Sequence, residues 1–361
     1  MSEKLRVGIL GGTGMVGQRF ISLLENHPWF EVVTIAASPR SAGKSYEEAV
    51  GSRWKMTTPM PEAVKKITVM NVNEVECVAS SVDFVFSAVD MSKDEIRAIE
   101  EAYAKTETPV VSNNSAHRWT PDVPMVVPEI NPEHFEVIAS QKQRLGTKRG
   151  FIAVKPNCSI QSYTPALTAW KEFEPYEVVA TTYQAISGAG KTFKDWPEMV
   201  ENIIPYIGGE EEKSEQEPLR IWGHVENGVI VKAEEPKITC QCIRVPVLNG
   251  HTAAVFVKFR KKPTKEELID RLVNFRSFPQ EAKLPSAPQQ FIRYMEECDR
   301  PQVQLDVDYE NGMGVSVGRL CEDTIYDWKF VGLSHNTVRG AAGGAVLCAE
   351  ALKAKGYINR K

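Results

Sequence analysis

Cys158, near the middle of the chain, has the chemistry and the position of a nucleophile. It follows the strand-like segment 151–155 and stands at the turn where a helix is expected to begin. The helix dipole and free backbone amides stabilise a thiolate at such a turn, and the same amides can hold an oxyanion on a bound carbonyl. Pro165 must kink this helix or delay its start. Cys158 is therefore a candidate nucleophile, provided that a base can reach it.

His251 is the histidine best placed to be that base. It ends a glycine turn, after Gly250, between two strand-like segments, and this position suits a side chain presented to a cleft. The ordinary pKa of a histidine, near 6.5, would let it shuttle a proton at neutral pH. His27 and His134 lie beside prolines in loops, and we expect both at the surface. The other cysteines are expected to be buried structural thiols: Cys77, Cys240, Cys242, Cys298, Cys321 and Cys348.

A glycine-rich turn near the N-terminus has the spacing of a dinucleotide site. Residues 8–17 follow a short apolar segment, lead into a helical pattern and contain G-x-G-x-x-G. In this context the glycines let backbone amides approach a pyrophosphate, which the helix N-terminus attracts. A glycine turn without a ligand is the alternative. The residues expected to contact a cofactor here are Gly11, Gly12, Thr13, Gly14, Met15, Val16 and Gly17.

The end of the second strand-like segment, residues 31–37, favours NADP over NAD. An NAD site usually places Asp or Glu there to hold the ribose hydroxyls. This chain instead offers Ser38, Arg40 and Ser41. Hydroxyls and a guanidinium suit a 2′-phosphate, although a solvated basic loop is the alternative.

The composition excludes several other classes of protein. The chain has 361 residues, of which 42% are hydrophobic and 25% charged, with a net charge of -4. This length fits about two globular domains, and the charge offers no general attraction to nucleic acid or to anionic membranes. No apolar stretch approaches the ~18 residues of a membrane span, and the first residues lack the apolar core of a signal peptide. The seven cysteines show no metal-ligand spacing, so we expect a cytoplasmic protein without a metal site.

Two sequence patterns divide the chain. Strand-like and helix-like segments alternate over the first 150 residues, which predicts βαβ crossovers and a Rossmann-like, doubly wound parallel sheet. Longer irregular connections follow, which predict a second, α+β domain with a mainly antiparallel sheet. A helix over 336–352, rich in Gly and Ala, is expected to pack back on the first domain. The strand-like segments are 5–10, 31–37, 82–89 and 110–111, then 151–154, 177–185, 238–247 and 252–259.

Seven motifs stand in one order along nearly the whole chain: 11–17, 38–43, 112–118, 156–161, 187–191, 244–252 and 336–344. Each alone is weak, but together they are highly specific, and they resemble the aspartate-semialdehyde dehydrogenase family in its archaeal and fungal branch. The resemblance implies an NADP-binding domain over 1–157, a catalytic and oligomerisation domain over 158–335, and a C-terminal helix over 336–361 that returns to the first domain. It also implies a homodimer or a homotetramer.

The resemblance further implies a reaction, the NADPH-dependent reductive dephosphorylation of L-4-aspartyl phosphate to L-aspartate 4-semialdehyde. This step leads toward threonine, methionine and isoleucine. Cys158 matches the family's acyl-enzyme nucleophile and His251 its acid/base. The implied substrate-side residues are Gln184, which helps orient the substrate, Arg244 for its carboxylate, Glu210 for its ammonium, and Lys213, Asn114 and Arg118 for its phosphate. The implied further cofactor-side residues are Ser87, Ser187, Gly188 and Asn336.

Alternatives remain at this stage. Related acyl-thioester reductases act on acetylglutamyl phosphate or on malonyl-CoA, and a non-catalytic NADP-binding regulator would keep the same fold. The presence of both Cys158 and His251 argues against the regulator. Any of residues 210–212 could meet the ammonium, and by composition alone this acidic run is a solvated loop. Arg118 beside Trp119 could be a stacked pair at the surface.

Overall fold

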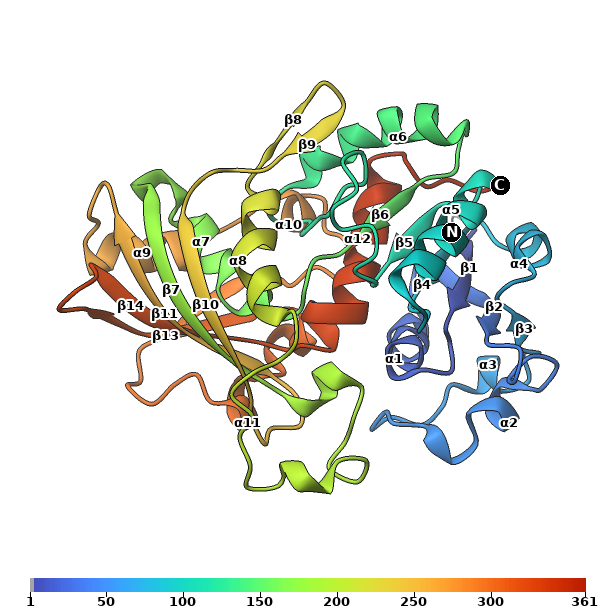
Figure 1. Cartoon of the computed structure of the whole chain (residues 1–361), viewed down its shortest axis with the longest axis horizontal. Coiled ribbons are helices and arrows are strands. Elements are labelled where there is room, and N and C mark those ends of the chain that lie inside the picture. Colours follow the sequence, from blue (N-terminus) through green and yellow to red (C-terminus); the bar gives the residue numbers. More distant parts are fainter. Residues whose placement is uncertain (1–2) are drawn as a thin grey trace.

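Two six-stranded sheets organise the computed structural model, which describes residues 3–361 (Figure 1). The first sheet is parallel throughout, with the order β3-β2-β1-β4-β5-β6. This is the order of a Rossmann-like doubly wound sheet, so the predicted fold of the first half is confirmed. The strands are β1 (Leu5–Leu10), β2 (Phe30–Ala37), β3 (Met70–Asn71), β4 (Phe84–Ser87), β5 (Val110–Ser112) and β6 (Ile152–Val154).

Helices cover this parallel sheet, as βαβ crossovers require. They are α1 (Met15–Leu24), α2 (Tyr46–Val50), α3 (Glu62–Lys65), α4 (Val75–Ser81), α5 (Lys93–Lys105) and α6 (Ile138–Leu145). The central strand β4 is buried at every residue, and its first three residues, Phe84 to Phe86, form the apolar run that such burial requires. The edge strand β3 has only two residues, too few to show a pattern, and the sequence analysis missed it.

The second sheet is mixed, with the order β10-β7-β11-β14-β13-β12. Its three central pairings are antiparallel, whereas the outer strands pair in parallel, so the prediction of a mainly antiparallel sheet is confirmed. Its strands are β7 (Pro175–Gln184), β10 (Lys237–Arg244), β11 (His251–Phe259), β12 (Ile292–Met295), β13 (Val315–Glu322) and β14 (Trp328–Ser334). A separate hairpin is formed by β8 (His224–Glu226) and β9 (Val229–Val231).

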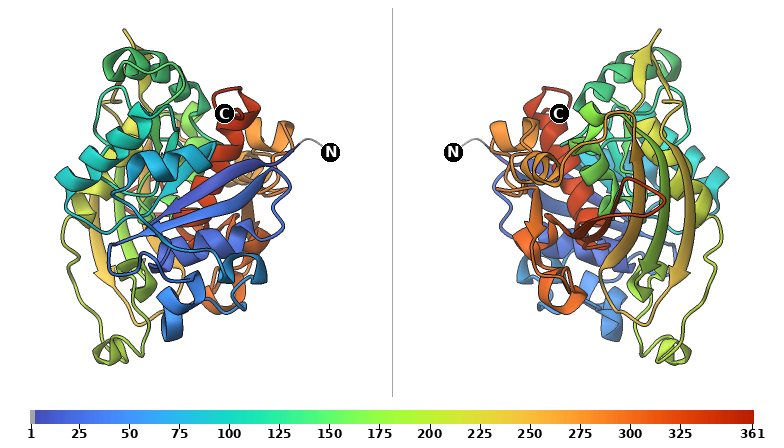
Figure 2. Two further views of the ribbon diagram at one scale, coloured as in Figure 1. Left: turned by 90° about the vertical axis from the view of Figure 1, so that its right-hand side faces the viewer. Right: turned by 90° about the vertical axis from the view of Figure 1, so that its left-hand side faces the viewer.

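One face of the second sheet packs on the core. Burial alternates at every second residue along β11, as a half-covered strand requires. The other face of this sheet carries half-buried side chains. The right-hand view of Figure 2 shows the molecule from the side on which this sheet lies. The helices of this half are α7 (Thr164–Ala169), α8 (Glu210–Ile221), α9 (Lys265–Val273), α10 (Phe278–Glu281) and α11 (Val303–Asp306).

The C-terminal helix α12 (Gly343–Ala354) returns to the first sheet, as predicted. It contacts β5 and α1, and Figure 1 shows it in red beside the parallel strands. The prediction of one helix from residue 336 is wrong, because a wide helical turn, Val338–Ala342, precedes α12 and Ala341 leaves helical geometry. This turn packs directly on the cysteine, and only glycine fits at position 340, since a Cβ there would lie 2.7 Å from Cβ of Cys158.

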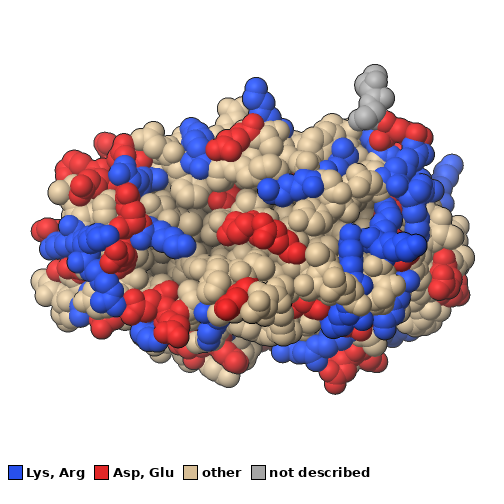
Figure 3. Space-filling model, turned by 90° about the horizontal axis from the view of Figure 1, so that it is seen from above, with Lys and Arg blue, Asp and Glu red and all other residues tan. Residues whose placement is uncertain are grey.

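Within residues 3–361, no helix combines the length and the apolar character needed to cross a membrane. On the face drawn in Figure 3, acidic and basic side chains are interspersed. That face therefore carries charge of both signs, which matches the near balance of the composition.

Candidate active site

Two strand ends bring Cys158 and His251 together. Cys158 lies shortly after β6, His251 begins β11, and Sγ of Cys158 is 3.3 Å from Nε2 of His251. On the other side of the ring, the backbone N–H of Ala185 donates to Nδ1 at 3.0 Å. Because Nδ1 accepts this hydrogen bond, the neutral ring carries its proton on Nε2, where it faces the sulfur.

His251 is buried and stays neutral at pH 7. Burial, together with the nearby charge of Arg244, lowers the pKa of His251 to about 3. The expectation of an ordinary pKa near 6.5 is therefore wrong, and its physical cause is desolvation of the imidazolium. His251 is arranged to donate a hydrogen bond rather than to collect a proton from solution.

The helix expected after Cys158 is only a 3₁₀ turn, Ser159–Ser162. Pro165 lies in the first turn of α7 and so delays the α-helix, as the sequence suggested. A single short turn supplies little dipole, and burial followed by the charge of Glu210 raises the pKa of the Cys158 thiol. The predicted stabilisation by a helix is therefore weak, and any thiolate depends on nearby cations instead.

A cavity of about 420 Å³ opens in front of Cys158, between the two sheets. It collects residues from the parallel sheet, from the second sheet and from the turn before α12. Among its lining residues are the predicted Cys158, Gln184, Arg244, Glu210, Lys213, Asn114 and Arg118, and also Met15, Val16, Ser187, Gly188 and Asn336. The fold thus gathers in one place residues that lie far apart in the sequence.

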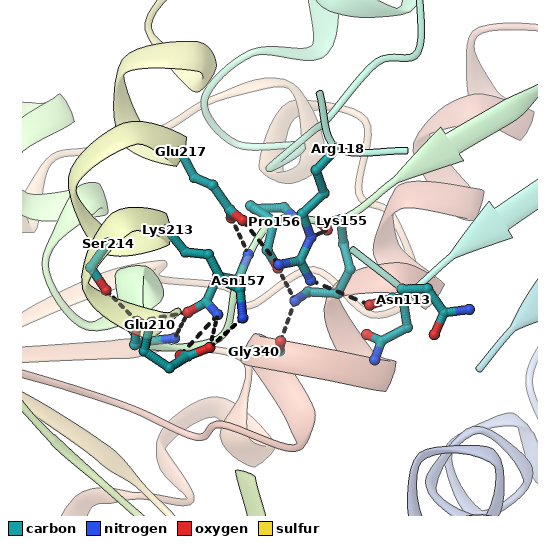
Figure 4. Close-up of polar contacts among 12 residues, drawn as sticks. Asn113, Arg118, Lys155, Pro156, Asn157, Glu210, Lys213, Ser214, Glu217 and Gly340 are labelled. Carbon is teal, nitrogen blue, oxygen red and sulfur yellow. Dashed lines mark hydrogen bonds and ion pairs between the residues drawn. The ribbon is translucent and has the colours of Figure 1, made fainter. Parts of the chain in front are cut away.

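Glu210 lies in the first turn of α8, so the interpretation of the acidic run as a loop is wrong. Its carboxylate accepts hydrogen bonds from Lys213 at 2.7 Å, from Asn157 at 3.0 Å and from Gln184 at 3.1 Å (Figure 4). Burial raises the pKa of Glu210, but the charge of Lys213 and these hydrogen bonds hold it below the ordinary value. The carboxylate is therefore ionised at neutral pH.

The two acidic residues after Glu210 do not face the cavity, so the structure distinguishes Glu210 from Glu211 and Glu212. The carboxylate of Glu211 accepts from the backbone of Cys242 at 3.4 Å, on β10, and Glu212 is exposed. Glu210 alone of the three lines the cavity.

Arg244 and Gln184 lie side by side because they are paired at the ends of the parallel strands β10 and β7. Nη1 of Arg244 donates to the backbone oxygen of Ala185 at 2.7 Å. Within residues 3–361 this is the one hydrogen bond of the guanidinium, which leaves its remaining donors available at the cavity. Planar donors of this kind match a carboxylate in a bidentate manner.

Arg118 is buried, with 6% of its surface exposed, so the interpretation of a stacked surface pair is wrong. Nη1 pairs with the carboxylate of Glu217 at 3.0 Å, and Nε donates to the backbone oxygen of Lys155 at 3.1 Å (Figure 4). The other carboxylate oxygen of Glu217 accepts from the backbone N–H of Asn157 at 2.5 Å. Glu217, which the sequence analysis missed, therefore connects Arg118 to the residue before the nucleophile.

Asn114 lines the cavity, but its amide nitrogen is already engaged. Nδ2 donates to Glu100 at 3.0 Å and to Ser87 at 3.2 Å. Ser87 itself is fully buried behind Asn114 and lines neither this cavity nor the one beside the glycine turn. Its hydroxyl therefore supports Asn114 instead of facing a ligand.

The glycine turn borders a second cavity, of about 270 Å³. The predicted residues that line it are Gly11, Thr13, Gly14, Ser38 and Arg40, and Arg53 and Asp90 line it as well. Ser41 is buried beside them and donates its backbone N–H to Ser38 at 2.9 Å. Met15 and Val16 line the first cavity, so α1 begins between the two cavities.

Close packing explains the glycines of this turn. Gly11 has φ +81°, and a Cβ there would lie 2.2 Å from the backbone oxygen of Ala88. A Cβ on Gly17 would lie 2.4 Å from the backbone oxygen of Gly11, and one on Gly12 would lie 2.4 Å from Ile35. Gly14 has no such clash, which leaves its surface free beside the cavity.

Asn336 connects the turn before α12 to the residues just before β11, the strand that His251 begins. Nδ2 donates to Oγ of Ser187 at 2.8 Å, and Oδ1 accepts from the backbone of Gly250 at 2.8 Å. Gly188 approaches the site so closely that a Cβ would lie 3.2 Å from the ring of His251. Ser187, Gly188 and Asn336 therefore form one wall of the first cavity.

Two predicted surface histidines are buried instead. His27 bonds to the carboxylate of Glu350 at 2.8 Å, and His134 bonds to the backbone oxygen of Gly223 at 3.1 Å. Both partners lie far away in the sequence, so local reasoning placed these histidines wrongly. The cysteine prediction is wrong for the exposed Cys77 and Cys298, whereas the thiols at 240, 242 and 348 are buried as expected.

Comparison with known proteins agrees with this architecture. Residues 6–138 match the model of the semialdehyde dehydrogenase NAD binding domain, and residues 167–339 match that of the semialdehyde dehydrogenase dimerisation domain. The chain is 42% identical to the aspartate-semialdehyde dehydrogenase of Methanothermobacter thermautotrophicus, over 96% of this chain and 98% of that protein. It is also 42% identical to that of Schizosaccharomyces pombe, over 98% of this chain and 99% of that one.

A solved structure shows the same fold. The aspartate-semialdehyde dehydrogenase of Candida albicans, crystallised with NADP, is 40% identical and superposes with a TM-score of 0.88 over 99% of this chain and 100% of that chain. Archaeal and fungal relatives thus match nearly the full length, which confirms the branch that the sequence motifs indicated. The chain belongs to the aspartate-semialdehyde dehydrogenase family.

Proposed function

We propose that this protein catalyses the NADPH-dependent reductive dephosphorylation of L-4-aspartyl phosphate to L-aspartate 4-semialdehyde. The observation that carries the proposal is the pairing of the buried His251 with Cys158, 3.3 Å apart, where Cys158 lines a cavity that also presents Arg244 and Glu210. Such a site holds a nucleophile, a hydrogen-bond donor to its sulfur, and groups of both charges for an amino acid. Membership of the family supports the same conclusion.

The two charged residues of the second sheet and α8 bind the amino-acid end of the substrate. Arg244 offers free guanidinium donors to the α-carboxylate, and the ionised Glu210 accepts from the ammonium. Lys213 and the buried Arg118 line the same cavity and supply positive charge for the phosphate. Gln184, hydrogen-bonded to Glu210, helps to orient the bound acyl group.

Catalysis begins when the thiolate of Cys158 attacks the acyl carbon of aspartyl phosphate. A carbon–sulfur bond forms, the bond from the acyl carbon to the phosphate oxygen breaks, and inorganic phosphate leaves with the bonding electron pair and takes up one proton from solvent. The product is a thioester on Cys158. The Nε2–H of His251 donates to the sulfur, so it stabilises the thiolate before the attack and again when the thiolate is expelled.

Bound NADPH supplies the hydride that reduces this thioester. Because the added hydride and the expelled thiolate carry the same charge, the reduction step itself takes up no proton, and Cys158 ends this step as a thiolate. His251 therefore has to hold its proton at Nε2 rather than exchange it with water, which its burial favours.

The residues around the glycine turn fit NADP. Gly14, which has no close contact at its Cβ position, borders the second cavity beside the start of α1 and would leave room for a pyrophosphate, and Ser38 and Arg40 are suited to a 2′-phosphate. The nicotinamide end belongs in the first cavity, where the side of α1 and the wall formed by Asn336 flank Cys158. We assign Gly12, Ser41 and Ser87 to supporting positions behind these contacts.

We further propose that the protein is a symmetric homodimer, or a homotetramer built from such dimers, formed through the outer face of the second sheet. The match to a dimerisation domain covers this sheet. Its outer face carries half-buried side chains such as Ala254, Phe256 and Val331, with Tyr183 37% exposed. We also propose that the chain divides into an NADP-binding domain, a catalytic and oligomerisation domain and a C-terminal helix, with the bounds 1–157, 158–335 and 336–361. The proposed location of the protein is the cytoplasm.

The direct test is an assay of NADPH oxidation with four acyl donors. We expect turnover with aspartyl phosphate and none above background with acetylglutamyl phosphate or malonyl-CoA. In the reverse direction, NADP reduction with aspartate semialdehyde should require inorganic phosphate. Acetyl phosphate serves as the fourth donor and tests whether the amino-acid groups are needed.

The control variant is Cys158→Ser, which keeps the shape of the site. It should bind NADPH as the wild type does but show no reduction. Turnover with another donor and none with aspartyl phosphate would show that the proposed substrate is wrong. Tight NADPH binding by the wild type without turnover on any donor would indicate a non-catalytic regulator.

A further inference from the structure

Lys155 is a buried cation that the mechanism above does not use. It lies three residues before Cys158, is 2% exposed and lines the same cavity. Its Nζ donates to two backbone oxygens, those of Pro156 and Gly340 (Figure 4). Among residues 3–361 no carboxylate forms an ion pair with Lys155, because the nearby Glu217 is paired with Arg118. A buried ammonium without a counter-ion is costly unless an anion forms beside it.

The two carbonyl acceptors place Lys155 beside the turn that carries Cys158. Pro156 belongs to the turn that carries Cys158, and Gly340 packs on Cys158 so closely that a Cβ there would lie 3.1 Å from Cα of Cys158. The start of α12 holds the lysine stem from the other side, since a Cβ on Gly344 would lie 3.7 Å from its Cε. Lys155 is therefore fixed between the cysteine turn and the turn before α12.

We propose that Lys155 is the positioning residue whose buried charge stabilises the Cys158 thiolate. This inference rests on the proposed function of Cys158 as the nucleophile. It gives the cysteine the cation that the short 3₁₀ turn does not supply. The ammonium and the thiolate neutralise each other inside the protein, while the carbonyls of Pro156 and Gly340 keep the ammonium in place.

Several other charged groups face Cys158 and must be considered with Lys155. Burial and Glu210 raise the pKa of the thiol, whereas Lys155 lowers it, followed by Arg118 and Arg244. His251 adds a hydrogen bond to the sulfur.

Lys155 has charged neighbours of its own. Burial, reinforced by the charge of Arg118, lowers the pKa of Lys155, whereas the negative charges of Cys158, Glu217 and Glu210 raise it, so an ionised Cys158 favours the ammonium form of Lys155. Arg118 is paired with Glu217 and Arg244 donates to the backbone oxygen of Ala185, whereas no carboxylate among residues 3–361 is paired with Lys155.

The test is the pH dependence of iodoacetamide alkylation at Cys158, read by peptide mass in the holoenzyme without substrate. The variants are Lys155→Met, which fills the volume, Lys155→Gln, which keeps one donor, and Lys155→Arg, which keeps the charge. Lys142→Met, at a half-buried lysine on α6 outside the cavity, is the matched control.

We expect both neutral variants to raise the alkylation midpoint by about one pH unit or more, because an opposite charge is removed. Their rate at neutral pH should fall about tenfold and recover at high pH. Lys155→Arg and Lys142→Met should keep the wild-type midpoint.

Two results would overturn the proposal. One is a wild-type midpoint in both neutral variants. The other is a rate lowered by the same factor at every pH, which would indicate a purely structural role. Since no substrate is present, neither result depends on which acyl donor the enzyme uses, so a failure here is distinct from a failure of the proposed reaction.

Discussion

The hydrogen bonds of individual residues decide what each side chain at this site can do. The N–H of Ala185 occupies Nδ1 of His251, so the ring proton faces Cys158 and the histidine acts as a donor. Glu210 is held ionised by Lys213 and two amides. These assignments concern single atoms, and they follow from contacts between segments that are distant in the sequence.

Arg244→Lys tests the proposed grip on the substrate carboxylate. Lysine keeps the charge but loses the planar pair of donors, so we expect KM for aspartyl phosphate to rise about 10- to 100-fold, the worth of a hydrogen bond to a charged group. Steady-state kinetics measure the change, with kcat expected to fall less than KM rises. Arg260→Lys, in a surface ion pair, is the control. A KM of Arg244→Lys within twofold of the wild-type value would contradict the proposed contact between Arg244 and the substrate carboxylate.

Sequence motifs were sufficient to name residues that the fold brings together, namely Cys158 with His251, and Arg244, Glu210, Lys213 and Arg118 around the cavity. They could not find Glu217 or Lys155, because a charged residue in a polar helix or before a proline gives no sign of burial. They also placed His134 wrongly, because its partner Gly223 lies 89 residues away. Burial of a polar residue is set by tertiary partners, which no local pattern reveals.

At the level of helices and strands, the residues of the site meet because they lie at the ends of neighbouring strands. Gln184 and Arg244 end two parallel neighbours, His251 begins the strand beside them, and Cys158 follows the last strand of the first sheet. The alternation of strands and helices predicted the first sheet. The helix α8 was missed, although three acidic residues in a first turn are favoured by the helix dipole and could have indicated it.

The glycine turn offers a matched pair of substitutions at the element scale. A Cβ on Gly17 would lie 2.4 Å from the backbone oxygen of Gly11, whereas the nearest atom to a Cβ on Gly14 is 3.5 Å away. We expect Gly17→Ala to lower the free energy of unfolding by about 1–3 kcal/mol through overpacking, and Gly14→Ala to change it by less than about 0.5 kcal/mol. Urea unfolding measures both. Equal stability of the two variants would contradict the packing described for this turn.

The stability of the whole molecule should depend on pH through its buried histidines. Burial lowers the pKa of His117, His134, His251 and His335. The unfolded chain takes up protons as the pH falls through about 6.5, whereas the folded protein does not. The stabilisation from these neutral rings is therefore complete above about pH 6.5 and decreases at lower pH, by up to about 1.4 kcal/mol per pH unit for each ring.

His134→Gln isolates one of these contributions. Gln can still donate to the backbone oxygen of Gly223, but it takes up no proton, so the loss of stability below about pH 6.5 should be shallower by up to about 1.4 kcal/mol per pH unit. Urea unfolding over this pH range measures the slope, with the exposed His224→Gln as the control. An unchanged slope in His134→Gln would show that the folded protein accepts a proton there.

Assembly is the other property of the whole molecule that a single substitution can test. Ala254 lies at the middle of the outer sheet face, between Thr181 and Val331 on the neighbouring strands. Ala254→Glu would place two like charges near the axis of a symmetric dimer, so we expect it to give monomers in sedimentation velocity experiments. Ile325→Glu, at a residue 76% exposed in a loop, should leave the wild-type assembly intact. An unchanged oligomer in Ala254→Glu would place the interface elsewhere.

The thioester on Cys158 is the central claim, and mass spectrometry tests it most directly. The enzyme is mixed with aspartyl phosphate without NADPH, quenched in acid and digested, while the released phosphate is measured. We expect the aspartyl group on the peptide that contains Cys158, with one phosphate released per adduct and neither signal in Cys158→Ser. An adduct at another residue, or reduction by enzyme whose Cys158 has been fully alkylated, would contradict the account.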